Sequence, residues 1–212
     1  MDYPNRLSAA KTAVDDLVGS LPDGATVKYV SFAERASVDK DGYANIKAED
    51  GTYIMRGVNK GIEQFSKSKT SKKILILVTD GFKSEDGYKS DKLKNFNGTV
   101  YTIGFAADNQ NLKGMTKNGG TYMYAKDTNT LGNVFDDLKT TIAAMIVDPM
   151  GDKVDYQKDA ADAEGSVEGA FTTVGNTLYW LPANVKKINP GETIKYTYTV
   201  KLNGNASMDA KD

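Results

Sequence analysis

One short run of apolar residues constrains the fold of this chain more than any other feature. Residues 74–78 (ILILV) lie between a pair of lysines and a Thr-Asp-Gly turn. An apolar run this short is typical of a strand that is buried on both faces inside a parallel sheet. Asp80 follows the run directly, at the strand end beyond which open α/β sheets bind their ligands. Asp80 and Gly81 also suit an ordinary turn, so their position leaves a functional and a structural interpretation open.

Helical and strand patterns alternate through the first 145 residues. The expected helices cover residues 6–21, a segment opening at 51–52, 92–96, 112–117 and 131–145. The expected strands cover residues 25–33, 43–46, 73–79, 99–105 and 121–125. This alternation predicts an α/β domain with βαβ connections and a mainly parallel sheet.

From residue 146 onward the helical period disappears. Residues 154–156, 178–181 and 194–200 are strand-like and are separated by acidic turns that contain Gly and Pro. In the last of these segments polar and apolar residues alternate, which indicates one buried and one solvated face, as in a β-sandwich. We therefore expect an α/β domain over residues 1–145 and part of a β domain over 146–212, the second being marginal for an independent core.

The composition excludes several classes of function. The chain has no cysteine and no histidine, which removes disulfides, thiolate and imidazole metal ligands, and Ser-His-Asp or Cys-His catalysis. Any metal must be a hard cation held by oxygen atoms. The formal net charge of -1 gives no reason to expect nucleic acid or an acidic membrane as a partner. No segment is apolar enough to span a membrane, and the first residues lack the pattern of a signal peptide.

Five segments in order resemble a von Willebrand factor A domain over roughly residues 2–145. They are residues 6–11 (RLSAAK), 30–32 (VSF), 51–52 (GT), 74–81 (ILILVTDG) and 101–104 (YTIG). The resemblance implies a Rossmann-like α/β fold with a divalent cation, usually Mg²⁺, at the carboxyl edge of the sheet. An Asp-x-Ser-x-Ser motif, a threonine and an aspartate hold this cation in the family's MIDAS-type site. The threonine corresponds to Thr52 and the aspartate to Asp80. Thr52 also suits the N-cap position of the next helix, and the two roles are compatible.

The chain departs from the family pattern at its beginning. No Asp-x-Ser-x-Ser occurs, no apolar strand precedes the first helix, and Met1 falls where the methionine of that motif would be. We therefore expect the chain to begin inside the domain, without its first strand. That strand would pair with the strands at 25–33 and 73–79, so two interior edges would be unpaired and prone to aggregation. Mg²⁺ binding by this chain is then expected to be weak or absent.

The second part has a resemblance of its own. Residues 147–157 (VDPMGDKVDYQ), 178–180 (LYW) and 191–202 (GETIKYTYTVKL) resemble pilus-tip adhesins of Gram-positive bacteria. In those proteins the A domain is inserted into an immunoglobulin-like domain, which resumes after it. The resemblance implies an extracellular parent protein in the cell wall or pilus. Its partners would be a host extracellular-matrix protein and the pilus backbone subunit.

These observations leave three candidate functions to be compared. The first is a fragment of a cell-surface adhesin that binds a protein through a metal-dependent face, impaired here by the truncation. The second is an intracellular, metal-independent A domain that scaffolds a multiprotein complex; it predicts no immunoglobulin-like tail. The third is an enzyme, such as a phosphatase with Asp80 as nucleophile. That chemistry requires a second aspartate two residues later, where this chain has Phe82, and no Gly-rich phosphate loop follows a strand. We therefore expect a binding module and no enzyme.

Overall fold

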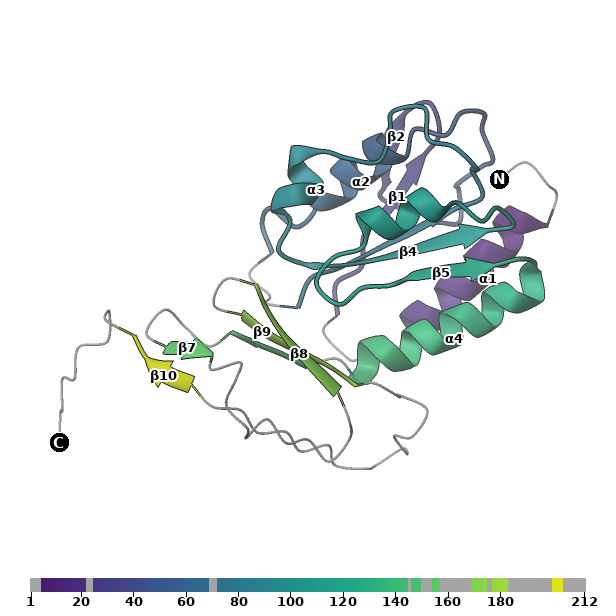
Figure 1. Ribbon diagram of the computed structural model, residues 1–212. Coiled ribbons are helices and arrows are strands. Elements are labelled where there is room, and N and C mark those ends of the chain that lie inside the picture. Colours follow the sequence, from purple (N-terminus) through teal and green to yellow (C-terminus); the bar gives the residue numbers. More distant parts are fainter. Residues whose placement is uncertain are drawn as a thin grey trace. The chain divides into compact units, whose positions relative to one another are not determined.

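The computed structural model describes residues 5–21, 25–68, 72–144, 146–149, 154–156, 169–174, 177–182 and 200–203. The helices are α1 (Arg6–Gly19), α2 (Ile54–Glu63), α3 (Asp91–Asn95), the 3-10 helix η1 (Gln110–Met115) and α4 (Thr128–Ala144). The strands are β1 (Tyr29–Phe32), β2 (Ala36–Asp39), β3 (Ile74–Thr79), β4 (Thr99–Phe105), β5 (Tyr122–Ala125), β6 (Ile146–Pro149), β7 (Val154–Tyr156), β8 (Gly169–Val174), β9 (Thr177–Pro182) and β10 (Val200–Leu202) (Figure 1).

The chain divides into two compact units, Met1–Lys139 and Thr140–Asp212. The expected domains, 1–145 and 146–212, stay a prediction.

Strands β3, β4 and β5 form a parallel sheet in that order, which confirms the expected architecture. All residues of β4 are buried, as they must be for a strand that is paired on both sides and covered on both faces. Figure 1 shows α2 and α3 on one side of this sheet, with α1 and α4 on the other. The prediction that the 74–78 run is buried on both faces was wrong in part, because buried and half-buried residues alternate along β3. Among the described residues, β3 pairs with β4 alone, so its second edge is less covered.

Strands β1 and β2 form a separate antiparallel pair, with Tyr29 opposite Asp39 and Phe32 opposite Ala36. The expected strand at 43–46 was wrong: these residues lie in a turn, and the partner of β1 is β2. The chain reverses within the three residues between the two strands, so the nearer segment pairs first. Tyr43 instead packs edge-on against Tyr29, with 5.2 Å between the ring centroids.

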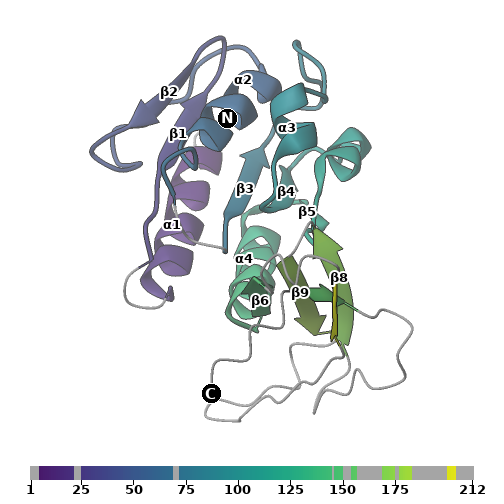
Figure 2. The ribbon, with the colours of Figure 1, turned by 90° about the vertical axis from the view of Figure 1, so that its left-hand side faces the viewer.

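Helix α2 bridges the two sheets, because it packs against β1, β2 and β3 (Figure 2). Within the described part of the chain, β1 and β3 are not paired with each other. The expected loss of a strand between these two edges stays a prediction. One face of α2 enters a cluster of buried residues from several elements: Ile54, Met55, Val58, Leu75, Leu77, Leu93, Phe96, Val100, Leu112 and Met115.

Asp127 explains why α4 begins at Thr128 and not at the expected residue 131. Its carboxylate accepts hydrogen bonds from the backbone N–H of Thr130 (2.8 Å) and from the Thr130 hydroxyl (2.6 Å). Both bonds favour the ionised carboxylate and hold the pKa of Asp127 below its usual value. The expected helix end at residue 145 lies outside the described residues.

The second unit contains two small antiparallel sheets, β6-β9-β8 and β7-β10 (Figure 1). Strands β7 and β9 confirm the expected strands at 154–156 and 178–181, whereas β8 had no recognised signal. Most of the expected strand at 194–200 lies outside the described residues. The immunoglobulin-like assignment of this unit stays a prediction.

Gly57 allows α2 to approach β1 closely. A Cβ atom at this position would lie 2.6 Å from ring atoms of Phe32 and 3.0 Å from its Cβ, which the backbone of β1 holds in place. We expect Gly57→Ala to lower the free energy of unfolding by about 1–3 kcal/mol through overpacking. The matched control is Gly132→Ala in α4, where a Cβ meets no atom within 4 Å. That change should be neutral or stabilising by up to about 1 kcal/mol. Equal effects of the two changes in urea denaturation would contradict this packing.

The buried side chain of Tyr101 should make the free energy of unfolding fall at alkaline pH. Its side chain is fully buried in β4, and its hydroxyl has no hydrogen-bond partner among the described residues. Burial raises the pKa of Tyr101 to about 12, whereas an unfolded tyrosine ionises near about 10. Between those values the unfolded state loses a proton that the folded state retains, so stability falls as the pH rises from about 10 to 12.

The contribution expected from Tyr101 is roughly 2–3 kcal/mol, measured by urea denaturation at pH 9 and pH 12. Tyr101→Phe should remove part of this slope, because Tyr43 and Tyr122 also have raised pKa values, and it should raise stability at pH 7, since it deletes an unpaired buried hydroxyl. An unchanged slope in the variant would show that other tyrosines cause the alkaline loss.

Candidate binding site at the carboxyl edge of the sheet

Asp80 lies immediately after β3, at the carboxyl edge of the parallel sheet, as expected from the sequence. Its side chain is 14% exposed. The N–H of Gly81 donates to the hydroxyl of Thr79 (3.1 Å), which fixes the turn that presents Asp80. The turn and the functional interpretation of this segment are therefore compatible.

Thr52 lies against the same turn. A Cβ atom on Gly81 would stand 2.2 Å from Cγ2 and 2.9 Å from Oγ1 of Thr52, so only glycine lets the two loops meet this closely. The structure thus brings together the segments that carry the two candidate metal ligands, Thr52 and Asp80, although 28 positions separate them in the chain.

The prediction that Thr52 is the N-cap of the next helix was wrong. Helix α2 begins at Ile54, its N-cap position is Tyr53, and no side chain there accepts a cap hydrogen bond. The side chains that cap α2 come instead from the loop after β3. The backbone N–H of Thr52 donates to Glu85 Oε1, and the N–H of Glu85 donates to the Thr52 carbonyl, both at 2.9 Å.

Ser84 and Asp86 satisfy the first turn of α2. The N–H of Ile54 donates to Ser84 Oγ (3.2 Å), and the N–H groups of Met55 and Arg56 donate to the two carboxylate oxygens of Asp86 (2.9 and 2.8 Å). Negative charge at this position is favoured by the unpaired N–H groups and the helix dipole. Sequence reasoning missed these caps because they come from a loop about thirty residues further along the chain.

Arg6 also lies at this edge, although its sequence pattern indicates only the start of a helix. Its Nη1 lies 3.5 Å from Asp80 Oδ2, and its side chain is 30% exposed. Arg6 is the first residue of α1, so this ion pair places the beginning of α1 at the same edge as Asp80 and Thr52. No local pattern distinguishes such an arginine from an ordinary solvated one.

The residues at this edge do not by themselves fit a divalent cation. Thr52 and Asp80 offer one hydroxyl and one carboxylate, whereas Mg²⁺ requires near-octahedral coordination by oxygen. The Arg6 guanidinium also places a positive charge beside Asp80, which opposes a second cation there. Across the described residues, no group of three or more acidic, histidine or cysteine side chains could hold a metal ion. The assignment of Thr52 and Asp80 as metal ligands stays a prediction.

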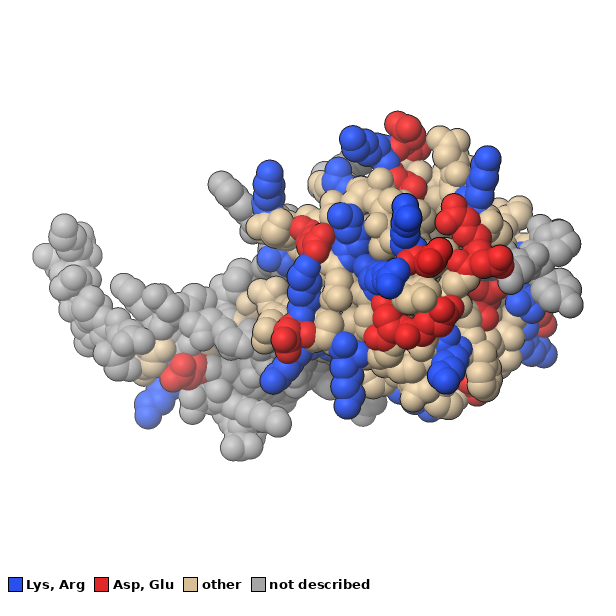
Figure 3. Space-filling view, turned by 90° about the horizontal axis from the view of Figure 1, so that it is seen from above, with Lys and Arg blue, Asp and Glu red and all other residues tan. Residues whose placement is uncertain are grey.

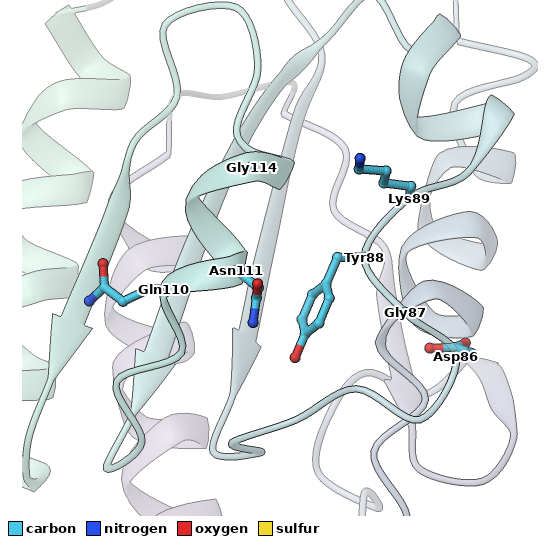
Figure 4. Close-up of a pocket in the computed structure, with 7 residues that line it drawn as sticks. All are labelled: Asp86, Gly87, Tyr88, Lys89, Gln110, Asn111 and Gly114. Carbon is cyan, nitrogen blue, oxygen red and sulfur yellow. The ribbon is translucent and has the colours of Figure 1, made fainter.

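Asn109 and Tyr88 tie the next loop to this edge. The Tyr88 hydroxyl accepts hydrogen bonds from the N–H of Ser84 (2.8 Å) and from Nδ2 of Asn109 (3.0 Å). Asn109 is buried, with 2% of its surface exposed. A depression of about 540 Å³ opens beside this contact, and Figure 4 shows the ring of Tyr88 reaching toward η1 inside it. Its lining residues are Asp86, Gly87, Tyr88, Lys89, Gln110, Asn111 and Gly114.

Phe82 is the most exposed large apolar side chain that the structure describes, at 74%. It follows Gly81, next to the candidate site. On the face seen in Figure 3, lysine and arginine side chains are interspersed with aspartate and glutamate. No broad field of one sign covers this face, so a ligand would be recognised here by individual side chains.

The fold and this edge permit a direct comparison with known families. The family model of the von Willebrand factor type A domain matches residues 4–137. This chain belongs to that family. The match covers more than half of the chain and includes the segments of Arg6, Thr52 and Asp80.

Several solved structures share the fold of this A domain. A von Willebrand factor type A protein from Catenulispora acidiphila is 20% identical, with a TM-score of 0.59 over 96% of this chain and 55% of its own. The pilus adhesin SpaC from Lactobacillus rhamnosus GG is 15% identical, with a TM-score of 0.53 over 96% of this chain and 37% of its own. Proximal thread matrix protein 1 from the mussel byssus, with a zinc-occupied MIDAS motif, is 20% identical at a TM-score of 0.57, over 71% of this chain and 46% of its own.

This chain therefore spans 37% to 55% of the length of these structures. A search of curated proteins found no match. None of the helices in the described part of the chain has the length and apolar character of a membrane span.

The capping of α2 by Asp86 predicts a large effect of one substitution. Asp86→Ala should lower the free energy of unfolding by about 2 kcal/mol, because it leaves two helix N–H groups and the Ser84 hydroxyl without their acceptor. Asp136→Ala, on the exposed surface of α4, is the control and should change stability by less than about 0.5 kcal/mol. A thermal or urea melt in which both variants behave alike would contradict the role of Asp86.

Proposed function

We propose that this chain is part of a cell-surface adhesin of the Gram-positive cell wall or pilus, and that its A domain binds a host extracellular-matrix protein. The role is binding and not catalysis. The observation that carries the proposal is the likeness to the pilus adhesin SpaC, which extends over 96% of this chain and so reaches beyond the A domain. The likeness to the Catenulispora acidiphila protein covers the same 96%, whereas the likeness to the mussel byssus protein covers 71%. The antiparallel strands of the second unit are compatible with part of an immunoglobulin-like domain, as the sequence resemblance implies.

The binding face in this proposal is the edge around Thr52 and Asp80. Three loops meet there, and their mutual hydrogen bonds hold them in place: Glu85 with Thr52, Asp86 with α2, and Asn109 with Tyr88. Loops positioned by a rigid scaffold are where binding surfaces are most often found. In the parent protein this face would carry the family's divalent cation, with the Asp-x-Ser-x-Ser segment completing the ligands.

We further infer that a strand outside the described residues completes the sheet between β1 and β3. Helix α2 packs against both strands, yet each is paired on one side alone within the described residues. A row of unsatisfied N–H and C=O groups along such an edge is a ready template for another strand.

A solid-phase binding experiment tests the proposed function. The full chain is immobilised and exposed to collagen, fibronectin and fibrinogen, and the parent protein is located by cell fractionation. Saturable binding to one of these proteins and a parent in the cell-wall fraction are expected. Binding to none of them, with a parent in the cytoplasm, would favour the alternative of an intracellular, metal-independent scaffold domain.

Hydrogen exchange tests the open edge of β3. In this chain the amides of β3 that point away from β4 should exchange much faster than the amides of β4, which is paired on both sides. Amides of β3 and β4 that are equally protected in native-state exchange would show that β3 already has a second partner.

A further inference from the structure

We propose that the depression between η1 and the loop after β3 binds a neutral sugar, a hexopyranose unit of a glycan, which packs on the ring of Tyr88 and hydrogen-bonds to Asn111. This inference goes beyond the proposed function. It concerns a second site with a different class of ligand, and the residues that line it include neither Thr52 nor Asp80.

The depression has the size and the kind of lining that small-molecule sites have. Its volume of about 540 Å³ lies within the range of about 300–1,000 Å³ that is usual for such sites. The aromatic ring of Tyr88 stands there among a few polar side chains. Gly87 and Gly114 leave space around it, because a Cβ atom at either position would meet no atom within 4 Å.

A buried asparagine holds two of the lining side chains in place. Asn109, with 2% of its surface exposed, donates from Nδ2 to the Tyr88 hydroxyl (3.0 Å). Its Oδ1 accepts from the backbone N–H and from Nδ2 of Asn111 (3.2 and 3.3 Å). Tyr88 and Asn111 are 23 positions apart in the chain, yet their side chains lie side by side (Figure 4). Both are therefore positioned before a ligand arrives, which lowers the entropy cost of binding.

The ring of Tyr88 forms a rigid apolar platform. It packs against the cluster of buried residues below α2, and the half-buried remainder of the side chain lines the depression. The hydroxyl already accepts hydrogen bonds from Ser84 and Asn109, so toward a ligand it can act only as a donor. A pyranose has C–H groups on its faces and hydroxyl groups around its rim. It can therefore cover the aromatic ring and accept this hydrogen bond at the same time.

The polar groups of the depression favour a neutral ligand that carries hydroxyl groups. Among the described residues, Asn111 keeps its Oδ1 and one Nδ2 hydrogen available, an acceptor and a donor that one sugar hydroxyl group can match. The carboxylate of Asp86 is taken by two N–H groups of α2 and by the Ser84 hydroxyl, so it offers little to a cation. Lys89 is exposed, and solvent screens its charge.

Nuclear magnetic resonance of the full chain tests this proposal with a simple glycoside. The probe is methyl β-D-galactopyranoside, which has a continuous patch of C–H groups on one face. It should shift the amide signals of Gly87, Asn111 and Gly114 in a saturable way, with a Kd on the order of 1–10 mM for so small a ligand. The signal of Gly132, in α4, should not move. Glycerol at the same concentration of hydroxyl groups is the control and should cause no saturable shift.

Substitutions separate the contributions of space, hydrogen bonding and charge. Gly114→Leu fills open space in the depression and should weaken binding at least about tenfold. Gly132→Leu, which also adds a side chain in open space but lies in α4, is the matched control and should bind normally. Asn111→Ala should weaken binding about fivefold through its lost hydrogen bonds. Lys89→Ala should change the Kd less than about twofold, because the ligand is neutral. Circular dichroism melts establish that each variant is folded.

Three outcomes would overturn the proposal. One is a galactoside that shifts the signals no more than glycerol does, and another is binding that Gly114→Leu and Asn111→Ala leave unchanged. The third is saturation of the same signals by the peptide N-acetyl-tetraproline-amide and not by the galactoside, which would assign the depression to a proline-rich segment. None of these outcomes affects the binding of a matrix protein to the immobilised chain, so failure here and failure of the proposed function can be told apart.

Discussion

The structure depends on how the N-terminus of α2 is satisfied. A helix begins with N–H groups that have no partner within it, and α2 lies at the junction between the two sheets of the first unit. The Ser-Glu-Asp segment after β3 supplies the acceptors, so one set of hydrogen bonds caps the N-terminus of α2 and also joins the loop before α2 to the loop after β3. The buried face of α2 then holds β1, β2 and β3 in one unit. Without these bonds the loop before α2 and the loop after β3 would lose the hydrogen bonds that join them.

The same edge holds a charge that bears on the predicted metal site. The family resemblance assigns a cation to Thr52 and Asp80, and this assignment stays a prediction. Arg6 places its guanidinium against Asp80. The pair keeps the carboxylate oriented and adds positive charge at a place where the described residues offer too few oxygen ligands for Mg²⁺.

Sequence reasoning predicted the parts of the fold that local patterns determine. The apolar run at 74–78, the alternation of helices and strands, and the position of Asp80 at a strand end all follow from periodicity and composition. The contribution of Arg6, the capping by Ser84 and Asp86, and the pairing of β1 with β2 depend on contacts between distant segments. Local patterns carry no signal for such contacts. Thr52 illustrates the difference: its proximity to Asp80 could be expected from the family resemblance, but its role as a helix cap was wrong because a remote loop took that role.

The most direct test of this account is a double-mutant cycle on stability, with Arg6→Gln, Asp80→Asn and both changes together, each melted with and without excess Mg²⁺. We expect a coupling energy of about 0.5–1 kcal/mol between the two side chains, as for a partly exposed ion pair, and no effect of Mg²⁺ on the original chain. A coupling energy near zero, together with a melting temperature that rises with Mg²⁺ and depends on Asp80, would contradict it. That result would show that Asp80 serves a metal ion and not Arg6.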